Sequence, residues 1–584
     1  MSFLNLLNRI HTPSDVKELS PADLPILCEE IREALIANMK AVGGHLGPNL
    51  GFLEATVALH YVFDSPRDKI VYDVSHQSYT HKILTGRKDG FVDPAHYGKY
   101  SGYTNPNESE HDMFTIGHTS TSVSLATGLA KGRDLLGGTE NIIAVIGDGA
   151  LSGGEAMEGL NIGSTLDSNL IVVFNDNDMS ISPNVGSMYK HFKALRDHKG
   201  QLEHNYFTIM GFDYYFVEDG HNIDELIKAF KAVKDVPRPS LIHVVTTKGK
   251  GWAEAEADKE SFHYINAAHK PKKGTTLTYA GVVADHLLEK MKTDPAVIAM
   301  TAAIPGTSGF NPERRAKAGK QFFDVGIAEE HMIAMAAGLA KNGAKPVVLE
   351  NSTFLSRTYD QLSQDLCLNS NPATIMSYGL SGGIGATDAT HTGAFDLAMM
   401  GSIPNLIVLC PASKDEVLAM LDWSLEQREH PVVIRVTGAV RNEPSGIAFS
   451  GKLTNEVTHK GQKVAILGLG PFYYLGNQLR EALKAELGIE ATLINPRLAS
   501  DVDSNTLDAL KADHEIIITL EDGVLAGGYG QKVAHYYGPT SMKVLTYGME
   551  KEVNDRVPKD ELYARYGLEP KSIIEDIKAL LREL

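Results

Sequence analysis

The chain contains two apolar runs that end in polar turns, IIAVIGDGA (142–150) and LIVVFNDNDM (170–179). Continuous runs rich in Val and Ile are typical of parallel strands buried on both faces, and the residues between them suit a helix. Asp148 and Asn177 stand at the ends of the two runs. Because ligands of doubly wound α/β folds bind beyond the carboxyl ends of the strands, we expect these two side chains at one cation site.

The donor atoms of this pair favour Mg²⁺ over a softer metal. One carboxylate, one amide oxygen, one backbone carbonyl and two phosphate oxygens would meet the near-octahedral oxygen ligation that Mg²⁺ prefers. Met179 can supply only its carbonyl, because a thioether is too soft a ligand. Gly147 and Gly149 let a phosphate approach the backbone, and we expect a helix from about Ser152 to direct its N-terminus at anionic oxygens.

Composition narrows the class of protein. A chain of 584 residues is too long for one core and predicts two to four domains. The net charge of −18 argues against nucleic acid and anionic membranes as partners. The sequence has no apolar run near the roughly 18 residues that span a bilayer, and no signal-peptide pattern. Three scattered cysteines, Cys28, Cys367 and Cys410, suit buried thiols, so we expect a cytoplasmic protein.

Periodicity predicts three α/β series along the chain. Ser20 and Pro21 are expected to open a long helix that Gly43-Gly44 ends. Strand-like runs then alternate with helical segments, interrupted by a polar stretch at 269–276 and by a second break at 441–453. The predicted strands of the first series are residues 69–75, 142–147, 170–176 and 240–247. We therefore predict three consecutive doubly wound α/β domains, with boundaries 1–275, 276–445 and 446–584.

Several motifs carry a resemblance to one family. They are YDVSHQSYTHKILTGR (72–87), GHTSTSVSLATGLA (117–130), GDGALSGGEAMEGLN (147–161), VVFNDNDMSISPNVG (172–186), FDVGIAEEHM (323–332), STFLSRTYDQ (352–361) and THTGAFD (390–396). These resemble the 1-deoxy-D-xylulose-5-phosphate synthases, a thiamine-diphosphate-dependent family of the transketolase-like group. The resemblance runs almost from end to end. It implies a diphosphate-binding domain with a Mg²⁺ site, a pyrimidine-binding domain, a transketolase C-terminal-like domain and a homodimer.

The resemblance also implies roles for individual residues. Asp148, Asn177 and the Met179 carbonyl would ligate Mg²⁺. The residues that would line the diphosphate and thiazolium are His76, Gly117, His118, Thr119, Gly149 and Ala150. Lys248 and Trp252 would lie near the cofactor, although the family more often has tyrosine at the position of Trp252. Phe354 would stack on the aminopyrimidine of thiamine diphosphate.

Glu329 has the central role that the resemblance implies. The matching glutamate hydrogen-bonds the pyrimidine ring nitrogen and favours the tautomer that activates the cofactor. Taken alone, a glutamate at this place is better explained as a helix-capping residue, because carboxylates suit a helix N-terminus. Its occurrence together with a Mg²⁺ motif in another domain favours the catalytic interpretation.

The implied reaction joins pyruvate to glyceraldehyde 3-phosphate with loss of CO₂. Its product would feed isoprenoid and thiamine biosynthesis. His45, His263 and His391 match substrate-side histidines of the family that could transfer protons, and Arg357 matches one of its arginines.

The chain departs from the family where the acceptor phosphate would bind. Leu380 and Gly438 stand where the resemblance places two phosphate-binding arginines. A charge-assisted hydrogen bond contributes about 1.5–3 kcal/mol, so two losses would weaken phosphate binding by roughly two to four powers of ten. Arg357 or Arg441 could replace them. The segment between Val185 and Gly211 is also shorter than is usual in the family.

These departures leave alternatives open. The chain could transfer ketol units as transketolases do, or use another aldehyde as acceptor. A 2-oxo acid dehydrogenase component would instead need a lipoyl partner, and the three-domain single chain disfavours it. A binding module without catalysis is the last alternative, and retention of Glu329 beside the Mg²⁺ motif argues against it.

Overall fold

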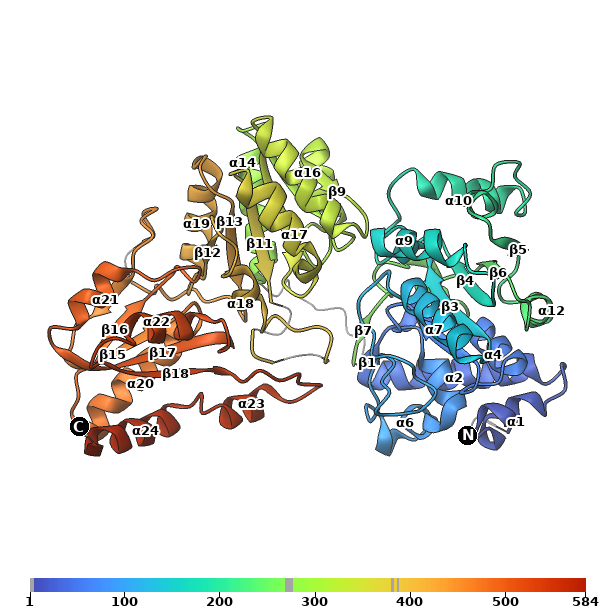
Figure 1. Ribbon diagram of the computed structural model, residues 1–584, viewed down its shortest axis with the longest axis horizontal. Coiled ribbons are helices and arrows are strands. Elements are labelled where there is room, and N and C mark those ends of the chain that lie inside the picture. The colour runs from blue at the N-terminus through green and yellow to red at the C-terminus, as the bar shows by residue number, and fades with distance from the viewer. Residues whose placement is uncertain (1–4, 268–276, 380–382, 386–387, 447, 584) are drawn as a thin grey trace. The chain divides into compact units, whose positions relative to one another are not determined.

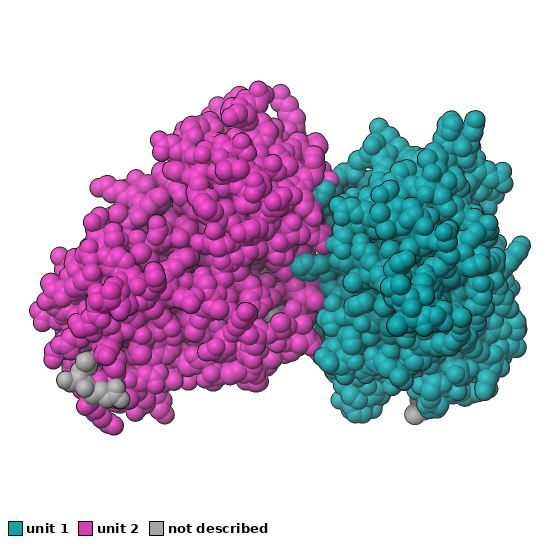
Figure 2. All heavy atoms as spheres, in the orientation of Figure 1, with its two compact units in different colours: residues 1–275, 326–328 teal, residues 276–325, 329–584 magenta. Residues whose placement is uncertain are grey.

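The computed structural model describes residues 5–267, 277–379, 383–385, 388–446 and 448–583. Its contacts divide the chain into two compact units, Met1–Thr275 with Gly326–Ala328, and Thr276–Val325 with Glu329–Leu584 (Figure 2). Unit 1 contains one large sheet and unit 2 contains two, each flanked by helices (Figure 1). The predicted α/β class with three such sheets is confirmed. The domain boundaries stay predictions, and the polar stretch 269–276 lies outside the described residues.

The large sheet of unit 1 is entirely parallel, in the order β2-β3-β4-β6-β5. Its strands are β2 (Lys69–Tyr72), β3 (Ile142–Gly147), β4 (Leu170–Asp176), β5 (Asp213–Val217) and β6 (Pro239–Val245). Four of them fall on the predicted runs. The fifth, β5, was missed because this edge strand is only partly buried and has a short aromatic sequence, DYYFV, in place of a run rich in Val and Ile.

Helices cover both faces of this sheet. The side chains of β3 alternate between two apolar clusters: Ile143 and Val145 pack in one, Ile142 and Ile146 in the other. The helices are α1 (Pro13–Lys17), α2 (Leu24–Val42), α3 (Leu46–Gly51), α4 (Leu53–Val62), α5 (Tyr79–Lys82), α6 (Asp89–Val92), α7 (Ser122–Leu136), α8 (Asp148–Leu151), α9 (Gly154–Gly163), α10 (Met188–Asp197), α11 (Tyr206–Met210), α12 (Ile223–Val233) and α13 (Ala253–Ala257), with short turns η1 (Leu7–Arg9), η2 (Ile83–Arg87) and η3 (Pro94–His96). The sheet is therefore doubly wound, as predicted.

Two helix starts differ from the predictions. The first long helix, α2, begins at Leu24, because the Ser20 hydroxyl donates to Asp23 and closes a separate turn before it. It ends at Gly43 as predicted. The helical turn after β3 begins at Asp148 itself and breaks at Ser152 before α9, because Gly153 is extended. The helix predicted from about Ser152 is α9, which begins two residues later at Gly154, and the separate turn before it was not predicted.

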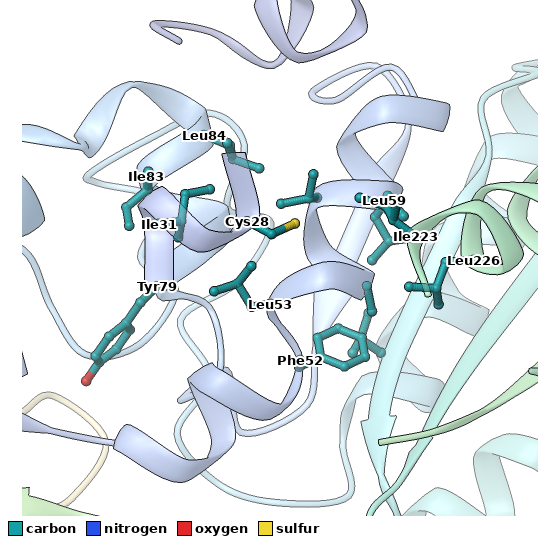
Figure 3. Close-up of a cluster of buried hydrophobic side chains, with 14 of the residues drawn as sticks. Cys28, Ile31, Phe52, Leu53, Leu59, Tyr79, Ile83, Leu84, Ile223 and Leu226 are labelled. Atoms are coloured by element: carbon teal, nitrogen blue, oxygen red, sulfur yellow. The ribbon is translucent and has the colours of Figure 1, made fainter. Parts of the chain in front are cut away.

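The first apolar cluster of unit 1 joins α2, α4 and α12. Figure 3 shows Cys28, Ile31, Leu53, Leu59 and Leu226 converging in this cluster, with the Tyr79 hydroxyl directed away from it. Cys28 is buried there, and Cys367 and Cys410 are buried in unit 2, as expected for thiols used in packing.

Unit 2 contains two sheets. The first has the order β12-β13-β11-β10-β8-β9 and is entirely parallel. Its strands are β8 (Val297–Thr301), β9 (Phe322–Asp324), β10 (Lys345–Asn351), β11 (Thr374–Tyr378), β12 (Ile407–Leu409) and β13 (Val432–Val436). The second has the order β14-β16-β15-β17-β18 and is parallel except at the β14 edge. Its strands are β14 (Glu456–His459), β15 (Lys463–Gly468), β16 (Thr492–Asn495), β17 (His514–Val524) and β18 (Lys543–Met549).

Helices of unit 2 pack against these two sheets. They are α14 (Tyr279–Met291), α15 (Pro312–Ala318), α16 (Glu329–Lys341), α17 (Tyr359–Gln361), α18 (Asp396–Met400), α19 (Lys414–Glu426), α20 (Phe472–Leu487), α21 (Ser504–Leu510), α22 (Tyr529–Tyr537), α23 (Lys559–Arg565) and α24 (Pro570–Glu583), with turns η5 (Gly319–Gln321), η6 (Phe354–Thr358) and η7 (Leu362–Leu368). Among the described residues, no helix of either unit combines the length and apolar character needed to cross a bilayer.

Candidate active site

Asp148 and Asn177 converge at the carboxyl ends of β3 and β4. The Met179 amide donates to Asp148 Oδ2 and to Asn177 Oδ1, at 3.1 Å in both cases. Both side-chain oxygens therefore lie within hydrogen-bond reach of one atom. The strands are neighbours in register, with Gly147 paired to Asn175, which explains why residues 29 apart in sequence meet here.

The negative charge of Asp176 lowers the electrostatic potential at Asp148. This carboxyl group is 1% exposed. Burial, and then the negative charge of Asp176, raise its pKa. Burial also opposes ionisation of Asp176, but hydrogen bonds and charge from His243 and Arg196 outweigh that effect and lower its pKa. Asp176 thus stays an anion, paired with Arg196 and His243, and its charge favours a proton or a cation at Asp148.

The surroundings of Asp148 fit a hard cation with a bound phosphate. Asn184 donates its amide to Asp148 Oδ2 at 2.8 Å, and its own Oδ1 is buried with no hydrogen-bond partner among the described residues. A Cβ at Gly149 would lie 2.8 Å from Ser180 Cβ, so only glycine fits between the two turns. No group of three or more His, Cys, Asp or Glu side chains suited to a metal occurs in the described parts of the chain. A single carboxylate with amide and carbonyl oxygens is the donor set of Mg²⁺ rather than of zinc.

Three of the predicted histidines form one cluster in unit 1. The ring centroids of His45, His76 and His263 lie 5.1–5.8 Å apart. A small antiparallel sheet brings His45 and His263 together, because β1 (Gly43–Gly44) precedes His45 and β7 (Ile265–Asn266) follows His263. Tyr103 and Tyr264 also place their rings 5.5 and 5.0 Å from that of His45.

The cluster lies beside a buried lysine. Burial, and then the charges of Lys248 and the other two histidines, lower the pKa of His263 well below its usual range. Burial lowers the pKa of Lys248 to about 7, against the opposing charge of Asp148. Lys248 Nζ donates to the carbonyl of Ser180, which follows Met179, one of the predicted Mg²⁺ ligands. Charge coupling therefore connects the histidine cluster to Asp148 through Lys248.

Trp252 packs against Phe262, the residue before His263. Its ring packs edge-on against Phe262 and carries the Lys40 ammonium 4.5 Å from its centroid. Among the described contacts of unit 1, none joins Trp252 to Asp148 or to the histidine cluster. Its cofactor role, predicted from the family position, stays a prediction.

The loop Gly117–Ser120 is held by a buried aspartate that sequence reasoning missed. Asp73 accepts hydrogen bonds from the amides of Ser120 and Ser122 at 2.7 and 2.9 Å. The Ser120 hydroxyl donates to the Ala150 carbonyl, so this loop and the turn after β3 are joined. Gly117 is buried, whereas His118 and Thr119 are partly exposed. The predicted positions 117–119 and 149–150 therefore belong to one structured region.

In unit 2, Glu329 begins α16 and is 5% exposed. Burial raises its pKa, although the positive charge of Arg357 opposes the shift. Arg357 Nη1 lies 3.6 Å from Glu329 Oε2, which has no hydrogen-bond partner among the described residues. Behind it, burial and then the charge of Glu329 raise the pKa of Glu350. A buried carboxyl with an unsatisfied oxygen is suited to a polar ligand atom.

Phe354 and His391 meet in unit 2. Their rings are 5.7 Å apart and nearly perpendicular. Asp388 lies 3.2 Å from His391 Nδ1, and although burial opposes its ionisation, the hydrogen bond with His391 helps to lower the pKa of Asp388. Asp388 is thus an anion that orients the imidazole of His391.

The arginines near the family's acceptor-phosphate positions point elsewhere. Arg435 is buried and donates to Asp396 and to the Asp522 carbonyl. The guanidinium of Arg441 lies 5.1 Å from the ring centroid of Tyr474. Gly438 is exposed at a positive φ of 75°, and Leu380 lies outside the described residues. Of these arginines, only Arg357 is placed beside Glu329.

Sequence reasoning missed residues that orient the predicted ones. They are Asn49, Asp73, Tyr103, Asn184, Tyr264, Glu350 and Asp388. Asp73 and Asn184 lie inside quoted motifs, and Asp388 precedes His391 by three residues, so proximity in sequence was an available signal. Asn49 follows His45 by four residues, so it gave the same signal, although its bonds to His76 and Tyr79 join a distant segment. Glu350 gave no such signal, because it lies 21 positions from Glu329 in sequence.

Comparison with known proteins agrees with these features. The family described as "1-deoxy-D-xylulose-5-phosphate synthase" matches residues 7–203 and 195–246. The family "Transketolase, pyrimidine binding domain" matches 275–439, and "Transketolase, C-terminal domain" matches 454–573. A 1-deoxy-D-xylulose-5-phosphate synthase of Dictyoglomus turgidum is 38% identical, covering 99% of this chain and 100% of the relative. One from Natranaerobius thermophilus is 37% identical, covering 99% and 98%.

The sheets and the family matches define a transketolase-like α/β protein. A transketolase from Leishmania mexicana is 16% identical over 97% of both chains, with a TM-score of 0.44, which is too low to add weight. The sequence relatives decide the family. The chain belongs to the 1-deoxy-D-xylulose-5-phosphate synthase family.

Proposed function

We propose that this protein is a thiamine-diphosphate-dependent transferase that decarboxylates pyruvate and joins the remaining two-carbon unit to glyceraldehyde 3-phosphate. The products are 1-deoxy-D-xylulose 5-phosphate and CO₂. The observation that carries the proposal is full-length membership of the synthase family at up to 38% identity. The same observation favours decarboxylative carboligation over ketol transfer and over passage of an acyl group to a lipoyl partner.

The residues around Asp148 would hold Mg²⁺ and the diphosphate. Asp148, Asn177 and the Met179 carbonyl supply oxygen ligands, and the negative field of Asp176 adds to the affinity for a divalent cation. The groups proposed to line the diphosphate and thiazolium are His76, Gly117, His118, Thr119, Gly149, Ala150 and Lys248. Lys248, with its pKa near 7, becomes protonated when an anionic phosphate lies close to it, so its positive charge can balance that of the ligand.

When bound, thiamine diphosphate supplies the carbanion nucleophile and the electron sink for decarboxylation. Glu329 holds a proton at the pyrimidine ring nitrogen, a task for which burial and a raised pKa suit its carboxyl group. Phe354 offers a face to the pyrimidine, and its perpendicular contact with His391 fixes its orientation.

The histidines transfer protons at substrate oxygens. Burial and positive neighbours favour the uncharged form of His263, in which one ring nitrogen donates a hydrogen bond and the other accepts one, so it can polarise and orient a substrate oxygen. His45 and His76 lie within 6 Å of it, and the three rings offer successive positions for a proton. In unit 2, His391 is the proposed proton-transfer residue, and Asp388 orients its imidazole.

A different aldehyde acceptor is the second candidate. Two features favour it. Arg435 is held in a buried ion pair with Asp396, and a glycine stands at position 438. Arg357, beside Glu329, is then the arginine available to an acceptor phosphate. Comparing kcat/KM for glyceraldehyde 3-phosphate and for unphosphorylated glyceraldehyde decides between the candidates. A preference above about 100-fold for the phosphorylated substrate excludes the second.

The main test is CO₂ release from pyruvate with and without glyceraldehyde 3-phosphate, in the presence of thiamine diphosphate and Mg²⁺. We expect release that rises when the aldehyde is added and equimolar formation of the five-carbon phosphate. Release without any carboligated product would contradict the proposal, as would no turnover of pyruvate with either aldehyde.

Mg²⁺ dependence, dimerisation and location are also part of the proposal. Removal of divalent cations with a chelator should abolish activity, and Mg²⁺ should restore it. We propose a homodimer by analogy with the family, and light scattering should give twice the 63.4 kDa mass of the chain. A cytoplasmic location is checked by fractionation of the source cells.

A further inference from the structure

One buried asparagine joins two of the clustered histidines. Asn49 lies in α3 and is 1% exposed. Its Nδ2 donates to the backbone carbonyls of both His45 and His76, at 2.7 Å in each case. Its Oδ1 accepts from the Tyr79 amide at 2.9 Å. The two histidines are 31 positions apart in sequence, and this single side chain bridges their backbones.

The geometry specifies an asparagine. The two carbonyl acceptors require two N–H donors from one group, and the Tyr79 amide requires an acceptor on the same group. Aspartate has the same shape but no donor, so it would face two carbonyl oxygens with a negative charge. Leucine has a similar volume and would leave all three backbone groups unsatisfied.

The backbone that Asn49 holds is strained. Val74 and Ser75 adopt positive φ values of 56° and 65°, immediately before His76. A β-branched residue in this region is a marked outlier, and such strain persists only where the surroundings over-determine it. The hydrogen bond from Asn49 holds the carbonyl of His76, the residue that follows this turn. The Tyr79 hydroxyl accepts a hydrogen bond from the His45 amide, which is a second connection between the two histidine segments.

We propose that Asn49 is a positioning residue that sets the spacing and direction of His45 and His76. The inference rests on the proposed function, in which these histidines act on the cofactor and substrate. It adds a residue that touches neither. Because the bonds go to backbone atoms, Asn49 acts on where the imidazoles project and not on their protonation.

The matched control is Asn38, a buried asparagine of α2 that is 3% exposed and donates to the Gly90 carbonyl at 3.1 Å. Asn49→Asp and Asn49→Ala should lower kcat/KM for pyruvate by roughly 30- to 100-fold, because small misplacements of catalytic groups have effects of this size. Asn38→Asp and Asn38→Ala should change it less than about threefold, with comparable losses in Tm. We expect the loss mainly in kcat, with Mg²⁺-dependent binding of thiamine diphosphate altered less than about threefold, since the Asp148 site is untouched.

Crystal structures of the wild type and Asn49→Ala separate this inference from the proposed function. We expect the His45–His76 ring separation to move from 5.1 Å by about 0.5 Å or more in the variant. If the wild type turns over no pyruvate, the proposed function fails, and the ring separation alone then tests the positioning role. An unchanged separation, or equal activity losses in the Asn49 and Asn38 variants, overturns the inference.

Discussion

Asp148 in unit 1 and Glu329 in unit 2 are both buried carboxyl groups at the first residue of a helix, yet the neighbouring charge that shifts the pKa most is negative for Asp148 and positive for Glu329. Asp148 faces the anion Asp176, and its hydrogen bonds come from neutral amides. Glu329 faces the cation Arg357 and keeps one oxygen without a hydrogen bond among the described residues.

The comparison shows that burial alone does not define a role for a carboxyl group. Burial raises both pKa values. A second negative charge near Asp148 makes a divalent cation the favourable partner, whereas Arg357 balances Glu329 and leaves it suited to exchanging a proton with a ligand. Variants of the two residues should therefore fail in different ways.

The largest effect is expected for Asp148→Asn. Loss of the one carboxylate ligand should weaken Mg²⁺-dependent binding of thiamine diphosphate by at least about 100-fold, measured by calorimetry, because even outer-shell changes reach this range. The unfolding free energy of the cofactor-free protein should change by no more than about 1 kcal/mol, since the amide keeps most of the hydrogen bonds. If Asp148→Asn binds thiamine diphosphate as tightly as the wild type at the same Mg²⁺ concentration, Asp148 is not the metal ligand and the contrast with Glu329 fails.

Glu329→Gln should instead lose turnover. We expect kcat to fall by roughly 10²- to 10⁴-fold, the usual contribution of a positioned proton-transfer group, while cofactor affinity changes less than about tenfold. Steady-state kinetics and calorimetry on the same preparation measure both quantities. A loss of affinity as large as that of Asp148→Asn would show that the two carboxyl groups share one role.

A smaller effect is expected for Asn184→Ala. Removing the amide that orients Asp148 Oδ2 should raise the Mg²⁺ concentration for half-maximal activity by about tenfold. The kcat at saturating Mg²⁺ should stay within about twofold of wild type. Asn161→Ala, at an exposed position of α9, is the control, and a similar shift in that variant would contradict the assignment.

The smallest effect concerns stability and pH. The folded-state pKa of Glu350 is raised above its ordinary value of 4.5, so the folded state binds this proton more tightly than the unfolded state does. Stability from this group is therefore complete below pH 4.5 and is lost as pH rises above it. Glu350→Gln should remove that loss, so its urea midpoint relative to wild type should rise from pH 5 to pH 8. Glu443→Gln, at an exposed position, should show no such trend, and a falling difference for Glu350→Gln would contradict the sign.

Much of the fold could be predicted from the sequence, because parallel strands buried on both faces are continuous apolar runs rich in Val and Ile. The runs that became β3, β4 and β6 are continuous Val- and Ile-rich segments, and the structure has strands there. The edge strands β5 and β14 are partly exposed and carry no such run, so sequence reasoning missed both.

Candidate site residues were readable where they lie in glycine-rich motifs next to strand ends, as Asp148 and Asn177 do. Trp252 was placed from family position alone, and its described contacts are with Phe262 and Lys40. Arg441 was a candidate replacement for phosphate binding, but its guanidinium lies over Tyr474. A residue's position in a motif does not specify the direction of a long side chain.

The sequence by itself determined the α/β class, the family and the pairing of Asp148 with Asn177, because these depend on local composition and on motifs a few residues long. Only the tertiary structure decided that Asp176 makes the field at Asp148 negative, that Asn49 bridges two histidines, and that Arg435 is held in an internal ion pair. Each of these depends on contacts between segments far apart in the chain, where the distance and direction of a side chain set its electrostatics and hydrogen bonding.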